Sequence, residues 1–176
     1  PSPYRVWISE IMLQQTRVET VIPYFERFLE RFSDAEGLAR APLDDVLACW
    51  SGLGYYRRAR SLHAAARELL EEHGGEIPRD FAAVLSLPGI GRYTAGAILS
   101  IAYGEPLPVV DGNVIRVISR WFGLDHPADS AILKRQVEAL AGILMPVDRP
   151  GDFNEAMMEL GATVCSPRNP RCKTCP

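Results

Sequence analysis

Two carboxylates in this sequence stand in surroundings suited to opposite protonation states. Glu10 lies in the run Val-Trp-Ile-Ser-Glu-Ile-Met-Leu, which is apolar on nearly all sides of a helix. Burial there would raise the pKa of the carboxyl and keep it ready to donate a proton, whereas an acid at the helix rim would keep its charge in water. Asp111 precedes Gly-Asn-Val-Ile-Arg and is a favoured residue type for a helix N-cap. A cap can also be a catalyst, and one protonated and one ionised carboxyl together suit cleavage of a glycosidic bond.

A glycine-containing turn, Leu87-Pro-Gly-Ile-Gly-Arg-Tyr-Thr-Ala95, separates two predicted helices. Pro88 ends the first helix, and Gly89 and Gly91 permit backbone angles that other residues avoid. Free N–H groups at the start of the next helix can bind a phosphate, a contact that holds DNA without reading its sequence. The spacing gives neither GxGxxG nor a P-loop. An ordinary helix–helix turn is the alternative.

Three cysteines near the end of the chain have the spacing of metal ligands, Cys165-x6-Cys172-x2-Cys175. Close-spaced cysteines in a cytosolic chain bind metal more often than they form disulfides. An iron–sulfur cluster or a structural zinc needs about four ligands, and Cys49, in an apolar helix, looks like a core residue instead. The chain begins with Pro1 and stops inside this motif, so we expect a fragment of a longer protein whose fourth ligand follows residue 176.

Helices must position these residues, because helical periodicity recurs along the chain and strand alternation is almost absent. Thr16 and Glu19 form a predicted capping box, and Gly74-Gly75 is expected to end a helix. The sequence therefore predicts an all-α fold, with helices, to within a few residues, at 6–15, 17–32, 43–50, 56–73, 80–86, 92–103, 112–122, 130–145 and 153–164.

One extended segment, Glu105-Pro-Leu-Pro-Val-Val110, is held out of helix by its two prolines. Such a segment is a natural seam between two lobes. We therefore expect a first domain over 1–106, with a helix-hairpin-helix at about 80–103, and a second over 107–176.

The overall charge gives no sign of a nucleic-acid partner, since 19 Lys and Arg against 22 Asp and Glu leave a net charge of −3. Basic clusters nevertheless occur in the stretch Tyr55 to Arg67 and at Arg168, Arg171 and Lys173, none with an acid among them. No apolar run approaches the roughly 18 residues of a membrane span, and no signal-peptide pattern opens the chain. We expect a monomeric, cytoplasmic, nucleoid-associated protein with no membrane partner.

Five segments, in order along nearly the whole chain, resemble the adenine DNA glycosylase (MutY) family of the helix-hairpin-helix (HhH-GPD) DNA glycosylases. They are Ile8–Phe25, Gly52–Arg60, Leu87–Ala97, Val110–Val114 and Phe153–Gly161. The resemblance implies a six-helix barrel lobe and an iron–sulfur cluster lobe. It also implies a 4Fe–4S cluster held by Cys165, Cys172, Cys175 and a further cysteine, and double-stranded DNA with an adenine mispair as partner. A short N-terminal segment, that cysteine and a C-terminal 8-oxoguanine-recognition domain of the family are absent from these residues.

The same resemblance implies catalytic roles. Glu10 takes the place of the acid that protonates the flipped adenine, and Asp111 that of the carboxylate that stabilises the positive sugar. Tyr93 and Asn113 match residues that support the reacting centre.

It also implies binding roles. Gln15 and Tyr55 match residues that enter the base stack opened by flipping, a use that suits a flat amide and an aromatic ring. Positions lining the adenine pocket are matched by Val18, Glu155 and Met158. Without the resemblance, these side chains would be interpreted as an exposed helix end (Gln15), surface packing (Tyr55), core (Val18 and Met158) and a solvated face (Glu155).

The implied activity is hydrolysis of the N-glycosidic bond of adenine mispaired with 8-oxoguanine or guanine, in base excision repair. An endonuclease III type enzyme, which cuts the strand through a lysine Schiff base, is the nearest alternative. It is disfavoured because the chain has only Lys134 and Lys173, and Tyr93 stands where such relatives carry lysine. A non-catalytic DNA-binding hairpin module and a zinc-binding structural module are further alternatives.

Overall fold

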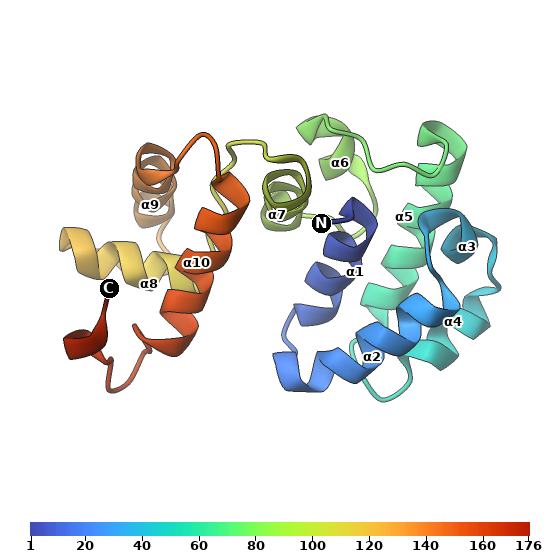
Figure 1. Cartoon of the computed structure of the whole chain (residues 1–176), viewed down its shortest axis with the longest axis horizontal. Helices are drawn as coiled ribbons and strands as arrows, with labels where there is room; N and C mark the ends of the chain where they lie inside the picture. The colour runs from blue at the N-terminus through green and yellow to red at the C-terminus, as the bar shows by residue number, and fades with distance from the viewer. The chain divides into compact units, whose positions relative to one another are not determined.

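The computed structural model describes residues 1–176 and contains helices and no strands (Figure 1). This confirms the predicted all-α class. Contacts divide the chain into two compact units, Pro1–Ile98 (unit 1) and Leu99–Pro176 (unit 2). The helices are α1 Pro3–Leu13, α2 Val18–Arg31, α3 Ala35–Arg40, α4 Leu43–Trp50, α5 Arg57–His73, α6 Phe81–Ser86, α7 Arg92–Tyr103, α8 Gly112–Phe122, α9 Ala131–Leu144, α10 Pro150–Thr163 and the short 3-10 helix η1 Cys172–Thr174.

Unit 1 is built around α5, against which α1, α3 and α4 pack. Its apolar stripes meet in a core of large aromatic side chains: Trp7, Phe28 and Trp50 are fully buried. The Phe28 ring lies edge-on to Trp50 with ring centroids 5.9 Å apart. This packing fixes the ends of α1, α4 and α5, next to which lie Gln15 and Tyr55, the two residues expected to enter the base stack and called the wedge residues below.

Unit 2 has α8 as its central helix, with α9 on one side and α10 on another. Val114, Val117 and Ile118 supply the face of α8 that packs on Leu133 and Val137 of α9. Because α8 starts directly after Asp111, this core fixes the backbone that carries that carboxylate.

The structure differs from the sequence expectations at four places, the starts of α1 and α10, the helix α3 and the predicted capping box. α1 begins at Pro3 and α10 at Pro150, earlier than predicted, because proline is well accepted in the first turn of a helix. α3 was not predicted, since six residues are too few to show an apolar stripe; it is stabilised by packing on α5. The capping box is wrong: Arg17 is the N-cap of α2 and makes no side-chain cap, and the Thr16 hydroxyl donates to the Gln14 carbonyl at 3.3 Å.

Other local expectations are confirmed. Gly74 ends α5 in the left-handed conformation with φ 61°, and residues 104–111 contain no helix. None of the helices is both long and apolar enough to cross a membrane.

Candidate functional site

Glu10 lies in the last turns of α1 and is buried, with 8% of its surface exposed. Trp7 and Ile11 beside it on the same helix are also buried. Of the two expectations for Glu10, a buried position is therefore confirmed and a solvated position at the helix rim is wrong. Its role as a proton donor stays a prediction. A carboxyl in this position exchanges little with water and can act only on a group brought to it.

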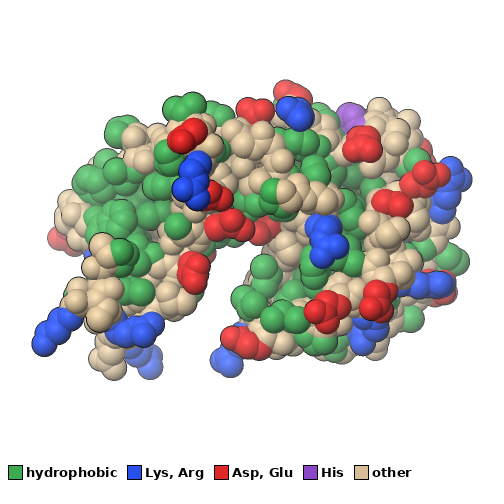
Figure 2. Space-filling model, in the orientation of Figure 1, with side chains coloured by type: hydrophobic (Ala, Val, Ile, Leu, Met, Phe, Trp, Pro, Cys, Tyr) green, Lys and Arg blue, Asp and Glu red, His purple; other side chains and the backbone are tan.

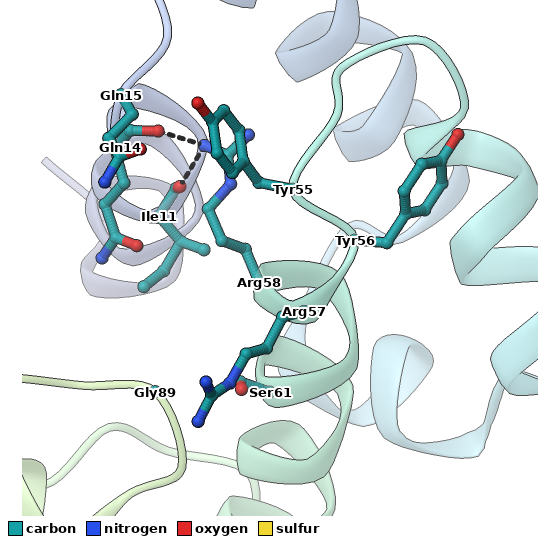
Figure 3. A pocket seen from close by; sticks show the side chains of 9 residues that line it. All are labelled: Ile11, Gln14, Gln15, Tyr55, Tyr56, Arg57, Arg58, Ser61 and Gly89. Atoms are coloured by element: carbon teal, nitrogen blue, oxygen red, sulfur yellow. Dashed lines mark hydrogen bonds between the residues drawn. The ribbon is translucent and has the colours of Figure 1, made fainter.

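A groove of about 610 Å³ in unit 1 gathers three of the predicted site residues, Gln15, Tyr55 and Gly89 (Figure 3). Tyr55 is 60% exposed, and Gln15 is also exposed. Both have positive φ, 56° for Gln15 and 49° for Tyr55, a conformation uncommon outside glycine. The remaining lining residues are Ile11, Gln14, Tyr56, Arg57, Arg58 and Ser61.

Arg58 is a residue of this groove that the sequence analysis did not single out. Its guanidinium runs from α5 toward the end of α1 and donates to the carbonyls of Ile11 and Gln14 (Figure 3). Burial lowers the pKa of Arg58, and a smaller charge interaction with Tyr55 acts in the opposite direction. Its only signal in the sequence was the cluster of arginines between Tyr55 and Arg67, which does not distinguish one member from another.

The predicted hairpin joins α6 to α7. Gly89 has φ 80°, and a Cβ there would lie 2.6 Å from the Cβ of Ser61. Both the backbone conformation and the lack of space therefore require glycine at this position. The expectation that Gly91 adopts a backbone angle open only to glycine is wrong, because its φ is not positive, and a Cβ there would meet nothing within 4 Å. Its phosphate contact stays a prediction. The chain's own packing therefore does not require a glycine at 91. Tyr93 is half-buried in the first turn of α7.

In unit 2, Asp111 is the N-cap of α8, as its sequence position predicted. Its Oδ1 accepts from the backbone N–H of Val114 at 2.8 Å, and its Oδ2 accepts from Nδ2 of Asn113 at 2.9 Å. Both carboxylate oxygens are thus oriented by N–H donors, which stabilise negative charge. The structure brings together Asp111 and Asn113, which the resemblance had placed at one reacting centre.

Two residues that the sequence analysis missed hold Asn113 in place. Arg116 donates from Nη2 to Oδ1 of Asn113 and to the carbonyl of Gly161, both at 2.7 Å, and from Nε to the carbonyl of Cys165, also at 2.7 Å. Gly161 of α10 is so close that a Cβ there would lie 2.5 Å from the Cβ of Asn113. Gly161 lies within a segment that carried the resemblance, but nothing local distinguishes it.

Asn154 is a third residue that sequence reasoning missed. It is 1% exposed, and its Oδ1 accepts from the backbone N–H of Val109, while its Nδ2 donates to Oγ of Ser100 and to the carbonyl of Leu107. The sequence does not show that this asparagine is buried or which groups it binds, so it could not be recognised before its partners were known. These bonds fix the extended segment that leads into Asp111.

The predicted adenine-pocket residues are divided between the units. Val18, at the start of α2, is 56% exposed, so the alternative that made it a core residue is wrong. On α10, Glu155 is exposed and Met158 is half-buried. They lie three residues apart and therefore share one face of that helix.

The three cysteines follow α10 in a loop and in η1. Cys172 is exposed, and Cys165 and Cys175 are half-buried; Sγ of Cys165 accepts from Arg120 Nη1 at 3.3 Å. No three His, Cys, Asp or Glu side chains lie close enough to hold a metal ion. With three thiols where about four are needed, these residues by themselves do not fit an iron–sulfur cluster.

Basic side chains gather at the C-terminal end of unit 2, where Figure 2 shows a group of Lys and Arg. Arg168, Arg171 and Lys173 are all exposed there. The local basic cluster expected from the sequence is thus available to an anionic partner although the net charge is negative.

Comparison with known proteins supplies the family. The model described as "HhH-GPD superfamily base excision DNA repair protein" matches residues 8–141. The chain is 50% identical over 174 residues to the adenine DNA glycosylase of Rattus norvegicus, an alignment that covers 98% of this chain and 34% of that protein.

Solved structures agree on the fold. A thermostable thymine-DNA glycosylase is similar with TM-score 0.90 and 32% identity over 99% of this chain and 80% of that one. A trapped covalent intermediate of endonuclease III with DNA is similar with TM-score 0.85 and 27% identity, over 100% of this chain and 81% of that one. The chain spans between 30% and 50% of the length of the curated relatives it matches.

Proposed function

Because the chain belongs to the HhH-GPD superfamily of base excision DNA repair proteins, we propose that it is the catalytic region of an adenine DNA glycosylase. Its substrate is double-stranded DNA with adenine opposite 8-oxoguanine or guanine, and its reaction is hydrolysis of the N-glycosidic bond. Identity of 50% to the rat adenine DNA glycosylase supports this choice within the superfamily. We further propose the two functional domains expected from the sequence, residues 1–106 and residues 107–176.

The observation that carries the proposal is the burial of Glu10, which is 8% exposed among the buried apolar residues of α1. In the proposed reaction its carboxyl donates a proton to the flipped adenine, and the base then leaves as a neutral molecule. Burial keeps bulk water away from the carboxyl, so a base brought to it meets the proton donor without competition from solvent.

Asp111 is assigned the second role, stabilising the positive charge that develops on the sugar. The N–H donors of Val114 and Asn113 support this role, because they hold the carboxylate in a fixed orientation. Tyr93 and Asn113 are assigned to support the reacting centre.

DNA contacts are assigned to the hairpin and the groove. The backbone around Gly89 and Gly91 faces a phosphate, and the open space beside Gly91 supports close approach of a ligand. Gln15 and Tyr55 enter the base stack, and their exposure in a shared groove supports that assignment. Val18, Glu155 and Met158 are assigned to the adenine pocket.

A lyase of the endonuclease III type is the second candidate, supported by the structural similarity to that enzyme. It requires an amine close to the sugar. Lys134 and Lys173, the only lysines, are both exposed, one on α9 and one in η1, and Tyr93 occupies the hairpin position. The chain therefore favours simple hydrolysis.

We also assign Cys165, Cys172 and Cys175 to a 4Fe–4S cluster, completed in the longer protein by a ligand from outside residues 1–176. The x6 and x2 spacing supports this assignment. When bound, the cluster would stabilise the loop after α10, and no step of the proposed reaction depends on it.

Single-turnover assays of the full-length protein test the proposal. The substrates are duplexes with adenine opposite 8-oxoguanine and, as a control, duplexes with thymine glycol. Release of adenine with an intact abasic strand is the expected result. Release of thymine glycol with strand cleavage would establish the second candidate instead.

A further inference from the structure

Arg58 contacts both turns that carry the proposed wedge residues, and no step of the proposed chemistry uses it. Its Nη1 donates to the carbonyl oxygens of Ile11 at 3.0 Å, Met12 at 2.7 Å and Gln14 at 2.7 Å. These carbonyls belong to the last turn of α1 and its C-cap, where a helix has no partners of its own for them. Arg58 thus closes the end of α1 immediately before Gln15.

The same guanidinium reaches the second turn. Its Nη2 donates to the Thr16 hydroxyl at 3.2 Å and to the Gly54 carbonyl at 3.3 Å. The guanidinium carbon lies 5.3 Å from the centre of the Tyr55 ring, within range of a cation–π interaction. The guanidinium therefore contacts Gln14 and Thr16, the neighbours of Gln15 in the chain. It also contacts Gly54, which precedes Tyr55, and the ring of Tyr55.

Both wedge residues need such support. Gln15 and Tyr55 have φ of 56° and 49°, and a left-handed conformation at these residue types persists only where surrounding contacts impose it. The contacts of Arg58 lie next to each of them along the chain. Without that guanidinium, each turn can relax toward an ordinary backbone conformation and carry its side chain away.

The position of Arg58 in its own helix does not explain its presence. It is in the first turn of α5, where a positive charge opposes the helix dipole, while a positive charge at the end of α1 is favourable. Partial burial also removes water from the guanidinium and lowers its pKa. Arg58 therefore destabilises the start of α5 and stabilises the two turns that carry Gln15 and Tyr55.

We propose that Arg58 is a positioning residue that joins Gln15 and Tyr55 into one preformed wedge for opening the base stack. The inference rests on the proposed function of those two side chains as intercalating groups. Two flat side chains from separate turns can separate stacked bases only while the distance between them is kept. If they are ordered before DNA binds, the complex does not bear the entropy cost of ordering them. Arg58 acts through them and touches neither adenine nor sugar.

The test compares Arg58→Ala and Arg58→Lys with Arg40→Ala in the full-length protein. Arg40 is the control, because it lies on α3 outside the basic stretch 55–67, its side chain is 68% exposed and it pairs only with Glu36 of its own helix, at 2.8 Å, among the ion pairs of the structure. With 2-aminopurine beside the target adenine, we expect Arg58→Ala to lose most of the fluorescence rise that reports unstacking. We also expect its single-turnover rate to fall about 10²-fold, as for a displaced positioning group. Arg40→Ala should match the wild type in both.

Hydrogen exchange provides a readout that does not depend on activity. In Arg58→Ala, amides of residues 12–17 and of residues 53–57 should exchange faster together, while the rest of α5 keeps its protection. Arg58→Lys keeps the charge but not the fork of donors, so both turns should still exchange faster. This second variant decides the question if Arg58→Ala does not fold.

The outcomes are distinguishable. If the wild type releases no adenine, the proposed function fails, and the exchange experiment still decides the role of Arg58. A rise in exchange in one turn alone, or in neither, overturns the inference. So does a wild-type rate of adenine release in a folded Arg58→Ala protein.

Discussion

Nδ2 of Asn113 donates to Oδ2 of Asp111 over 2.9 Å, while Oδ1 of the same carboxylate caps α8. One oxygen of Asp111 is therefore bound by the backbone and the other by a side chain. We predict that Asn113→Ala leaves the helix cap intact but slows adenine release about 10²-fold, because the carboxylate loses a fixed orientation. Asn113→Asp should be slower still, since it replaces a donor by a second negative charge. Single-turnover rates at matched thermal stability measure this, and equal rates in all three proteins would contradict it.

The contact between α10 and Asn113 predicts an effect of adding a single methyl group. Gly161→Ala places a Cβ 2.5 Å from the Cβ of Asn113 and 3.0 Å from its backbone, so either α10 or Asn113 must move. We expect a loss of about 1–3 kcal/mol in the free energy of unfolding, together with slower catalysis. Gly142→Ala on α9 is the control, because a Cβ there meets nothing within 4 Å. Denaturant unfolding of both variants gives the comparison; similar stability of the two would show that α10 adjusts without cost.

Replacing the buried acid tests its proposed role directly. Glu10→Gln keeps the volume of the side chain but removes a proton donor of suitable acidity, so DNA binding should persist while adenine release is nearly abolished. The exposed Glu72→Gln on α5 serves as control. Binding is measured by titration of a duplex with adenine opposite 8-oxoguanine, and the rate in a single turnover. A near-normal rate in Glu10→Gln would remove this residue from the chemistry.

The hairpin position predicts the fate of the DNA strand. With tyrosine at position 93, the wild type should leave an intact abasic strand, and borohydride should trap no stoichiometric covalent complex. Tyr93→Lys should gain some trapping, because at the reacting centre proposed for residue 93 an amine would lie near the sugar carbon exposed after base loss. Stoichiometric trapping by the wild type would favour the lyase candidate.

The cysteine loop predicts metal content. Residues 1–176 alone should hold iron weakly, because the segment after α10 supplies three thiols and these are not gathered into a metal site. The full-length protein should hold about four irons per chain, with a brown colour that chelation of the iron removes. Elemental analysis after anaerobic purification measures both. One tightly bound zinc and no iron in the full-length protein would exclude the cluster.

Sequence reasoning succeeded where the signal is local. The helical period, the left-handed Gly74 at the end of α5 and the Asp111 cap each depend on a few neighbouring residues, and all are present in the structure. It failed for α3, whose stability comes from packing on α5, and for Thr16, whose hydroxyl bonds to Gln14 instead of capping a helix. A capping motif in the sequence offers a hydrogen bond, and the tertiary path of the chain decides whether it forms.

The sequence by itself determined which residue types the proposed chemistry uses: a glutamic acid in a mostly apolar segment, a capping aspartate, a glycine turn and three cysteines. Only the tertiary structure decided that Glu10 is buried and that Gln15, Tyr55 and Gly89 share a groove. The tertiary structure alone identified Arg58, Arg116 and Asn154. Their hydrogen bonds to Gln14, Gly161 and Ser100, respectively, join residues that are 44 to 54 positions apart in the sequence. Arginine and asparagine are ordinary surface residues until the fold removes their water and supplies distant carbonyl and hydroxyl partners, and nothing in their neighbours along the chain indicates that this happens.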